Sequence, residues 1–198
     1  MFIELADHLR CPADHPERYL VLLPARIEER SVREGMLGCP VCGREFRIED
    51  GVLDVGGAPP SIASTALDGD AAAALVGLTG PGGYLAVVGG VAERHEALSG
   101  AIPGVRLVTV NPPGSVVDRH ELSVLRGGTF PLRSSSMRGV LLGPGFGSDP
   151  HWVAEALRIT LSGLRIVGEG EVPASPDLEL LGSAGGCWVG AKVRNRLG

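Results

Sequence analysis

From about residue 64 onward, short apolar runs alternate with segments whose apolar residues recur at helical spacing. In the segment 64–78, for example, Leu67, Leu75 and Leu78 repeat at that spacing around a run of four alanines. Such alternation of strands with helices predicts a mostly parallel, doubly wound α/β sheet. The predicted strands are residues 84–88, 105–110, 139–142 and 164–168, the predicted helices are 64–78, 93–100 and 150–162, and an antiparallel hairpin of 178–181 with 187–193 closes the sheet.

The first 56 residues follow a different pattern, with short stretches in which polar and apolar positions alternate. Residues 45–49, Glu-Phe-Arg-Ile-Glu, alternate like a half-buried strand and lead into an Asp50-Gly51 turn. Residues 19–27 and 32–37 predict a hairpin ahead of them, and the Gly/Pro-rich run 56–61 breaks any element that reaches it. We therefore predict a small β-rich domain at 1–56, a linker at 57–64 and an α/β domain at 65–198.

Composition narrows the class of protein. A chain of 198 residues with 44% hydrophobic content can build a core, and its length suits one ordinary domain plus a small one. No apolar run approaches the roughly 18–20 residues that cross a bilayer, so we expect no membrane span. Glu4 and Asp7 are untypical of a signal peptide, which makes the cytoplasm the expected location. The net charge of −5 disfavours electrostatic binding to nucleic acid.

Three of the four cysteines lie in the first domain at spacings typical of a zinc site. Cys39-Pro-Val-Cys42-Gly43 is a knuckle in which two thiolates three positions apart can bind one tetrahedral ion. Cys11 has no second cysteine nearby, so the fourth ligand is His15 or, at the usual spacing, Asp14. The alternatives are a redox pair or cysteines that only pack. A redox pair usually opens a helix, whereas a strand is predicted here, and this favours zinc.

A zinc ion in this domain is expected to be structural. Some 56 residues contain too little core to fold stably alone, so the metal would contribute folding energy directly. With Cys11, His15, Cys39 and Cys42 as ligands, the ion has no open coordination position, and we assign it no catalysis.

The second knuckle, the strand 45–49 and the Asp-Gly turn after it occur in an order known from one family. Residues 9–55 resemble the small zinc-ribbon proteins that activate RNA and protein methyltransferases, ribbons that are also fused to some bacterial methyltransferases. The first knuckle departs from that pattern because its second cysteine is missing. Seven basic against eleven acidic residues at positions 1–54 give a net charge of −4, which suits contact with protein better than contact with phosphate.

Three stretches of the second domain carry a further resemblance. Residues 84–91 contain a strand and two glycines, 106–112 a second strand, and 130–142 a Phe-Pro-Leu segment that leads into the next strand. Their order resembles the class I S-adenosylmethionine methyltransferases over residues 65–198, which implies a truncated Rossmann-like sheet. The resemblance also implies that Gly89, Gly90 and Asn111 hold the cofactor. A strand followed by two glycines can equally be a turn that needs a positive φ.

The acidic cofactor contacts of that family are missing from this sequence. The resemblance places Ala86, Asn111, Arg126 and Arg138 at its four acidic positions, and Val91 at the second glycine of its loop. Hydrogen bonds to charged groups contribute about 1.5–3 kcal/mol each, so losing them weakens binding by about 10²–10⁴-fold. The end of the fourth strand, 143–146, also offers no Asp, Asn or Tyr to position a nucleophile. We therefore assign no catalytic residue.

The sequence thus predicts a degenerate methyltransferase with a structural zinc ribbon, acting as a binding or regulatory partner of a methyltransferase or of a second copy of itself. The alternative is an active S-adenosylmethionine-dependent methyltransferase whose remodelled pocket keeps Gly89, Gly90 and Asn111 as ligands. A nucleic-acid-binding zinc module is a third class, which the acidic ribbon disfavours. The scattered residues His95, His120 and His151 are expected at the surface or in caps, and Cys187 is expected to pack as a small apolar residue.

Overall fold

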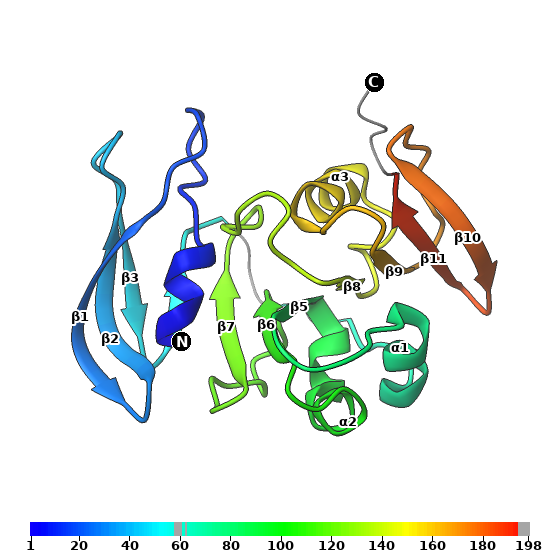
Figure 1. Cartoon of the computed structure of the whole chain (residues 1–198), viewed down its shortest axis with the longest axis horizontal. Coiled ribbons are helices and arrows are strands. Elements are labelled where there is room, and N and C mark those ends of the chain that lie inside the picture. Colours follow the sequence, from blue (N-terminus) through cyan, green and yellow to red (C-terminus); the bar gives the residue numbers. More distant parts are fainter. Residues whose placement is uncertain (58–60, 62, 194–198) are drawn as a thin grey trace.

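One continuous mixed sheet of eleven strands runs through the described residues, 1–57, 61 and 63–193, of this computed structural model (Figure 1). The strand order is β1-β2-β3-β4-β7-β6-β5-β8-β9-β11-β10. The strands are β1 Val21–Glu28, β2 Ser31–Gly38, β3 Glu45–Glu49, β4 Val52–Asp54, β5 Tyr84–Val88, β6 Arg106–Val110, β7 Leu122–Arg126, β8 Val140–Leu142, β9 Arg165–Glu169, β10 Leu178–Ala184 and β11 Cys187–Lys192.

Helices cover both faces of the central strands. Figure 1 shows α1 and α2 on one side of these strands and α3 on the other. Successive residues of the buried strand β5 face the two layers in turn, so that Leu85 and Val87 pack with α1 and α2 while Ala86 and Val88 pack toward α3. This is the layering of an α/β fold, as predicted. The helices are η1 Ile3–His8, α1 Gly69–Val76, η2 Gly89–Arg94, α2 His95–Ala101 and α3 Pro150–Ile159, of which η1 and η2 are 3₁₀ helices.

The strands β7, β6, β5, β8 and β9 are parallel to one another. Their spatial order reverses between β5 and β8. In doubly wound sheets, ligands bind beyond the carboxyl ends of the strands at such a reversal. β11 is antiparallel to β9 and β10 is antiparallel to β11, so the predicted closing hairpin is confirmed.

The first 54 residues contribute an antiparallel meander of four strands, β1 to β4. At the turn between β3 and β4, Asp50 and Gly51 have φ values of 49° and 82°, and a two-residue type I′ hairpin requires positive φ at both positions. Within β3, Phe46 and Ile48 are buried and their neighbours are exposed. Both hairpins predicted for this part of the chain are confirmed.

β4 connects the meander to the rest of the sheet, because it pairs in parallel with β7 from Val52 opposite Val124 to Asp54 opposite Arg126. The hydrogen-bonded sheet therefore continues across the boundary predicted near residue 56, and the domain limits stay a prediction. Residues 58–60 and 62 of the predicted linker 57–64, and residues 194–198 of the predicted second domain, lie outside the described residues. In the part of the chain that is described, no helix is long and apolar enough to cross a membrane.

Two helices are shorter than the pattern predicts. α1 begins only after Asp68, whose carboxylate accepts hydrogen bonds from the backbone N–H groups of Asp70 and Ala71. It ends at Val76, and the following residue, Gly77, adopts a left-handed φ of 63°. α3 ends at Ile159, because Thr160 is extended and forms a bridge with Met137.

Candidate functional site

The cysteines predicted as zinc ligands lie together with His15 at one end of the meander. Cys11 follows η1, and Cys39 and Cys42 lie in the turn between β2 and β3. The four ligand atoms are all within 4.8 Å of one another. Cys11 Sγ is 3.7 Å from Cys42 Sγ, and Cys39 Sγ is 3.3 Å from His15 Nε2.

These separations fit a tetrahedral zinc ion. With Zn–S near 2.3 Å and Zn–N near 2.05 Å, tetrahedral geometry places two sulfurs about 3.8 Å apart and a sulfur and nitrogen about 3.6 Å apart. His15 Nδ1 donates a hydrogen bond to the carbonyl of Pro16 at 2.8 Å, which leaves the lone pair on Nε2, the atom that faces the cysteines. Asp14, the alternative ligand, is exposed and does not belong to this group.

The thiols of the group have unequal acidities. Burial opposes ionisation of Cys39, but backbone N–H groups of Cys42 and Val41 are directed at its sulfur and lower its pKa to about 6. Burial raises the pKa of Cys11 to about 11. A metal ion would have to displace the proton of Cys11, whereas Cys39 is already largely a thiolate at neutral pH.

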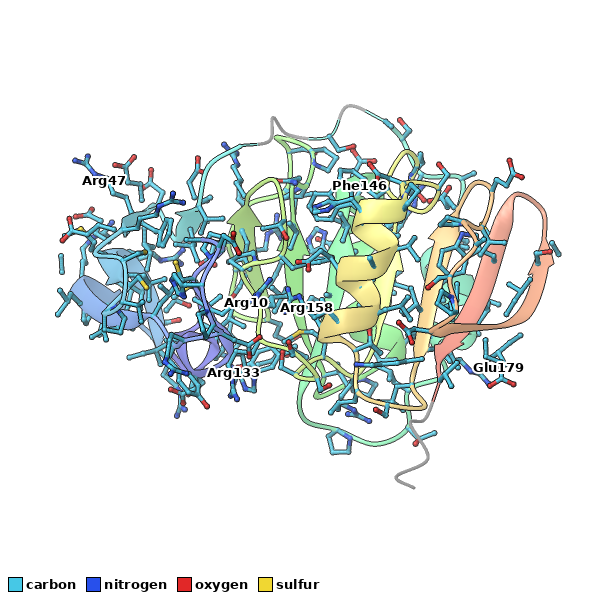
Figure 2. All side chains as sticks on the ribbon, turned by 90° about the horizontal axis from the view of Figure 1, so that it is seen from above. Arg10, Arg47, Arg133, Phe146, Arg158 and Glu179 are labelled. Carbon is cyan, nitrogen blue, oxygen red and sulfur yellow. The ribbon has the colours of Figure 1, made fainter. Side chains whose placement is uncertain are left out.

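Gly89 and Gly90 lie at the end of β5, where the resemblance places the cofactor loop, but other parts of this chain cover them. Both glycines are buried, and Gly89 has a φ of 69°. A Cβ on Gly89 would lie 2.6 Å from the ring of Phe146, and one on Gly90 would lie 2.1 Å from the carbonyl oxygen of Ala63. Figure 2 shows Phe146 beside the end of α3 at which that helix begins. The backbone at this turn is therefore in contact with protein.

Asn111 follows β6 and is fully buried. Its Oδ1 accepts a hydrogen bond from Gly127 N at 3.0 Å, and its Nδ2 donates one to Gly127 O at 2.8 Å. Its φ is 50°, in the left-handed region that Asn tolerates better than most residues. Asn111 thus clamps the end of β6 to the residue that follows β7, and both ends of its amide are in use.

Ser61 and residues 63–66, which precede α1, lie at the carboxyl ends of the parallel strands. Ser61 N donates to the carbonyl of Asn111 at 3.1 Å. Further along, the Thr65 hydroxyl and the Ala66 N–H both donate to the carboxylate of Glu169 at the end of β9, the latter at 3.0 Å. Thr65 and Glu169 are both buried. The sequence does not predict the contact of Thr65 and Ala66 with Glu169, because residues about 100 positions apart share no sequence pattern.

None of the other positions that the resemblance aligns with acidic cofactor contacts offers an acceptor to a nucleoside, because Ala86 has no polar side-chain atom and Arg126 and Arg138 can only donate. Ala86 is fully buried in β5. Arg126 lines a groove between β3, β4 and β7, and Arg138 donates to backbone carbonyls of the loop 79–82. The residues present therefore do not fit S-adenosylmethionine in the manner of the family that the sequence resembles.

Charged side chains connect the loop that carries Cys11 and His15 with α3. Arg10 Nη2 lies 3.7 Å from Glu155 Oε2, and Arg158 Nη1 lies 3.8 Å from Glu17 Oε2. Within α3, Arg158 Nε and Glu155 Oε1 are 2.7 Å apart. Figure 2 shows Arg10 and Arg158 between the N-terminal strands and α3. Burial alone would raise the pKa of Glu155, but hydrogen bonds from Arg158 and Thr129 hold it below its ordinary value of 4.5.

The remaining residues singled out in the sequence are dispersed. His95 Nδ1 donates to Ala92 O at 3.1 Å near the start of α2, and His151 Nε2 lies 3.2 Å from Gly128 O. The His120 ring packs against Phe2 with 5.7 Å between centroids. Cys187 is half-buried and packs against the core on the α1 side.

The protein thus has a mixed α/β fold with a doubly wound parallel core, and Cys11, His15, Cys39 and Cys42 form a Cys₃His cluster. No protein-family model matches the chain, and no curated protein matches it.

Several solved structures are similar to parts of it. One is a chain from the complex between the Haloferax volcanii Trm112 methyltransferase activator and a protein described as a methyltransferase, with 21% identity, 50% of each chain covered and a TM-score of 0.41. The cyclase SpnF has 12% identity, 64% of this chain and 66% of its own covered, and a TM-score of 0.44. An S-adenosyl-L-methionine methyl transferase from Silicibacter pomeroyi DSS-3 has 16% identity, coverage of 62% and 88%, and a TM-score of 0.43. This chain spans between half and two thirds of the length of the first two.

Proposed function

We propose that this protein is a degenerate methyltransferase that does not use S-adenosylmethionine and acts as a binding or regulatory partner of another protein. The observation that carries the proposal is that both ends of the Asn111 side-chain amide form hydrogen bonds with the backbone of Gly127. The contacts of Phe146 and Ala63 with the glycine turn support it, because they place protein atoms where the family holds its ligand.

The Cys₃His group has a structural role in this proposal. Cys11, His15, Cys39 and Cys42 supply four ligands, which leaves no position for substrate or water. Bound zinc would fix the loop after η1 to the turn between β2 and β3. Because Arg10 and Glu17 belong to the same loop, the metal would also order their contacts with α3.

The partner is expected to be a protein, either a methyltransferase or a second copy of this chain. The net charge of −4 over residues 1–54 supports protein over nucleic acid, since a phosphate backbone would be repelled. The resemblance of residues 9–55 to methyltransferase activators is the reason to include a methyltransferase among the partners.

Thermal unfolding in the presence of S-adenosylmethionine or S-adenosylhomocysteine tests the cofactor part of the proposal. A ligand at 100 times its Kd stabilises the native state by about 2.7 kcal/mol, which corresponds to a Tm increase of about 5–10 °C for a chain of this length. We expect no increase at about millimolar ligand. A saturable rise in Tm would favour the alternative, an active methyltransferase in which residues 63–66 move aside and Gly89, Gly90 and Asn111 hold the cofactor.

A further inference from the structure

The two edges of the sheet differ in their capacity to accept another strand. β1 is at one edge and β10 at the other (Figure 1). Pro24 in β1 has no N–H to donate. Arg26 also forms salt bridges with Glu28 and Glu34 along this edge. These features are typical of an edge that is protected from further pairing.

Among the described residues, no strand pairs with the outer edge of β10, and most of its side chains are apolar. It contains neither proline nor lysine, and Glu179 is its only charged residue. Six of its seven residues are exposed, among them Leu180 at 48% and Leu181 at 50%. Edge strands of this length usually carry several charges or a proline that block pairing, so an exposed edge with a single charged residue indicates an interaction surface.

The groove beside β10 continues this apolar surface. Leu181 lies at the shift in register between β10 and β11. It lines a groove of about 460 Å³ together with Leu75 of α1 and Val189 of β11. A seven-residue strand is only about 24 Å long, so a stable interface also needs side-chain contacts of this kind beside the strand.

The sequence of β10 is compatible with pairing to itself. In an antiparallel pair centred on Leu181, Leu181 faces its own copy, Leu180 faces Gly182, and Glu179 faces Ser183. No like charges oppose each other, and the twofold axis brings the two grooves beside α1 to the same face. We propose that β10 is the interface of a homodimer, in which the sheets of two chains join edge to edge.

The test uses the full chain and three variants, starting with its mass in solution by sedimentation velocity. We expect a dimer at micromolar concentration, and we expect Leu181→Lys to raise the dimer Kd at least about 100-fold, because two ammonium groups would meet at the axis. Leu23→Lys, at a residue of β1 that is 58% exposed, is the matched control and should leave the dimer intact. A wild-type chain that stays monomeric at about 100 μM overturns the proposal.

Leu181→Cys keeps the test valid if the lysine variant does not fold. Residues directly opposite in an antiparallel pair have Cα atoms about 4.5–5.5 Å apart, within the range that a disulfide can bridge. Under mild oxidation, Leu181→Cys should yield a covalent dimer on a non-reducing gel, whereas the wild type and Leu23→Cys should not. A dimer that resists Leu181→Lys, or that Leu181→Cys fails to cross-link, would show that the chains associate through another surface.

Discussion

The side chain of Asn111 could bind a cofactor or hold the chain's own backbone, and only its neighbours in the fold distinguish these two roles. Its place after β6 is where the resemblance puts a cofactor contact, and its sequence context contains nothing against that role. In the fold, the backbone of Gly127 binds both ends of its amide. An aspartate could accept from Gly127 N but could not donate to Gly127 O, which gives a physical reason for an amide at this position.

Replacing Asn111 with Asp tests this clamp. The change restores the acidic residue of the family, but it leaves the Gly127 carbonyl unpaired and buries a carboxylate. We expect the free energy of unfolding to fall by about 2–3 kcal/mol in urea titrations, with no gain in S-adenosylmethionine binding. Asp50→Asn, an exposed residue that also has a positive φ, is the control and should change stability little. An Asn111→Asp chain that is as stable as wild type and binds the cofactor would refute the clamp.

At the scale of elements, the sequence predicted strands and hairpins better than helix ends. Apolar runs such as β5 and the turn chemistry of Asp50-Gly51 depend on local residues, and both predictions are confirmed. The predicted strands do not include β7, Leu122–Arg126, because Ser123 interrupts its apolar run, which is short. Pairing with β4 on one side and β6 on the other stabilises β7, and such pairing depends on distant residues.

The candidate metal site is the part of the molecule that local sequence predicted most completely. Spacing alone identified Cys39 and Cys42 and reduced the fourth ligand to His15 or Asp14. Only the fold places His15, and not Asp14, with the cysteines. The choice between His15 and Asp14 as the fourth ligand depends on the path of the loop from Cys11 to Leu20, which no sequence motif specifies.

Metal content of purified variants checks this assignment. We expect about one zinc per chain in the wild type, the same in Asp14→Ala, and a 10–100-fold or greater loss of affinity in His15→Ala, since a three-ligand site lacks one coordinate bond. Cys39→Ser should lose zinc and unfold at a lower temperature because the metal contributes folding energy. Zinc retained by His15→Ala but lost by Asp14→Ala would reverse the assignment, and a zinc-free wild type would remove it.

At the scale of the whole molecule, the N-terminal meander and the doubly wound core behave as one sheet joined by β4 and β7. Sequence patterns divided the chain near residue 56 because glycine and proline break elements there, but they carry no information on which strands pair across such a break. The charged contacts between the metal loop and α3 are equally long-range. Arg10 and Glu155, for instance, approach to 3.7 Å although they are far apart in the sequence.

The acid sensitivity of this junction provides a prediction. The pKa of Glu155 is lowered in the fold, so its stabilising contribution is present above its ordinary value of 4.5 and is lost as pH falls below that value through the folded pKa. We expect Glu155→Gln to cost about 1.5–3 kcal/mol near pH 7 and progressively less as the pH falls below 4.5. Urea unfolding at each pH measures the difference. Stability curves for the two chains that stay parallel across this range would contradict the prediction.

Direct calorimetric titration of the zinc-loaded chain with S-adenosylhomocysteine and S-adenosylmethionine tests the central proposal, that the chain's own residues fill the position where the resemblance places a cofactor. The contacts of Asn111 with Gly127, of Ala63 with Gly90 and of Phe146 with Gly89 predict no binding heat at physiological cofactor concentrations. A saturable titration with one site and a micromolar Kd would contradict the proposal and favour the alternative, a methyltransferase with a remodelled cofactor pocket.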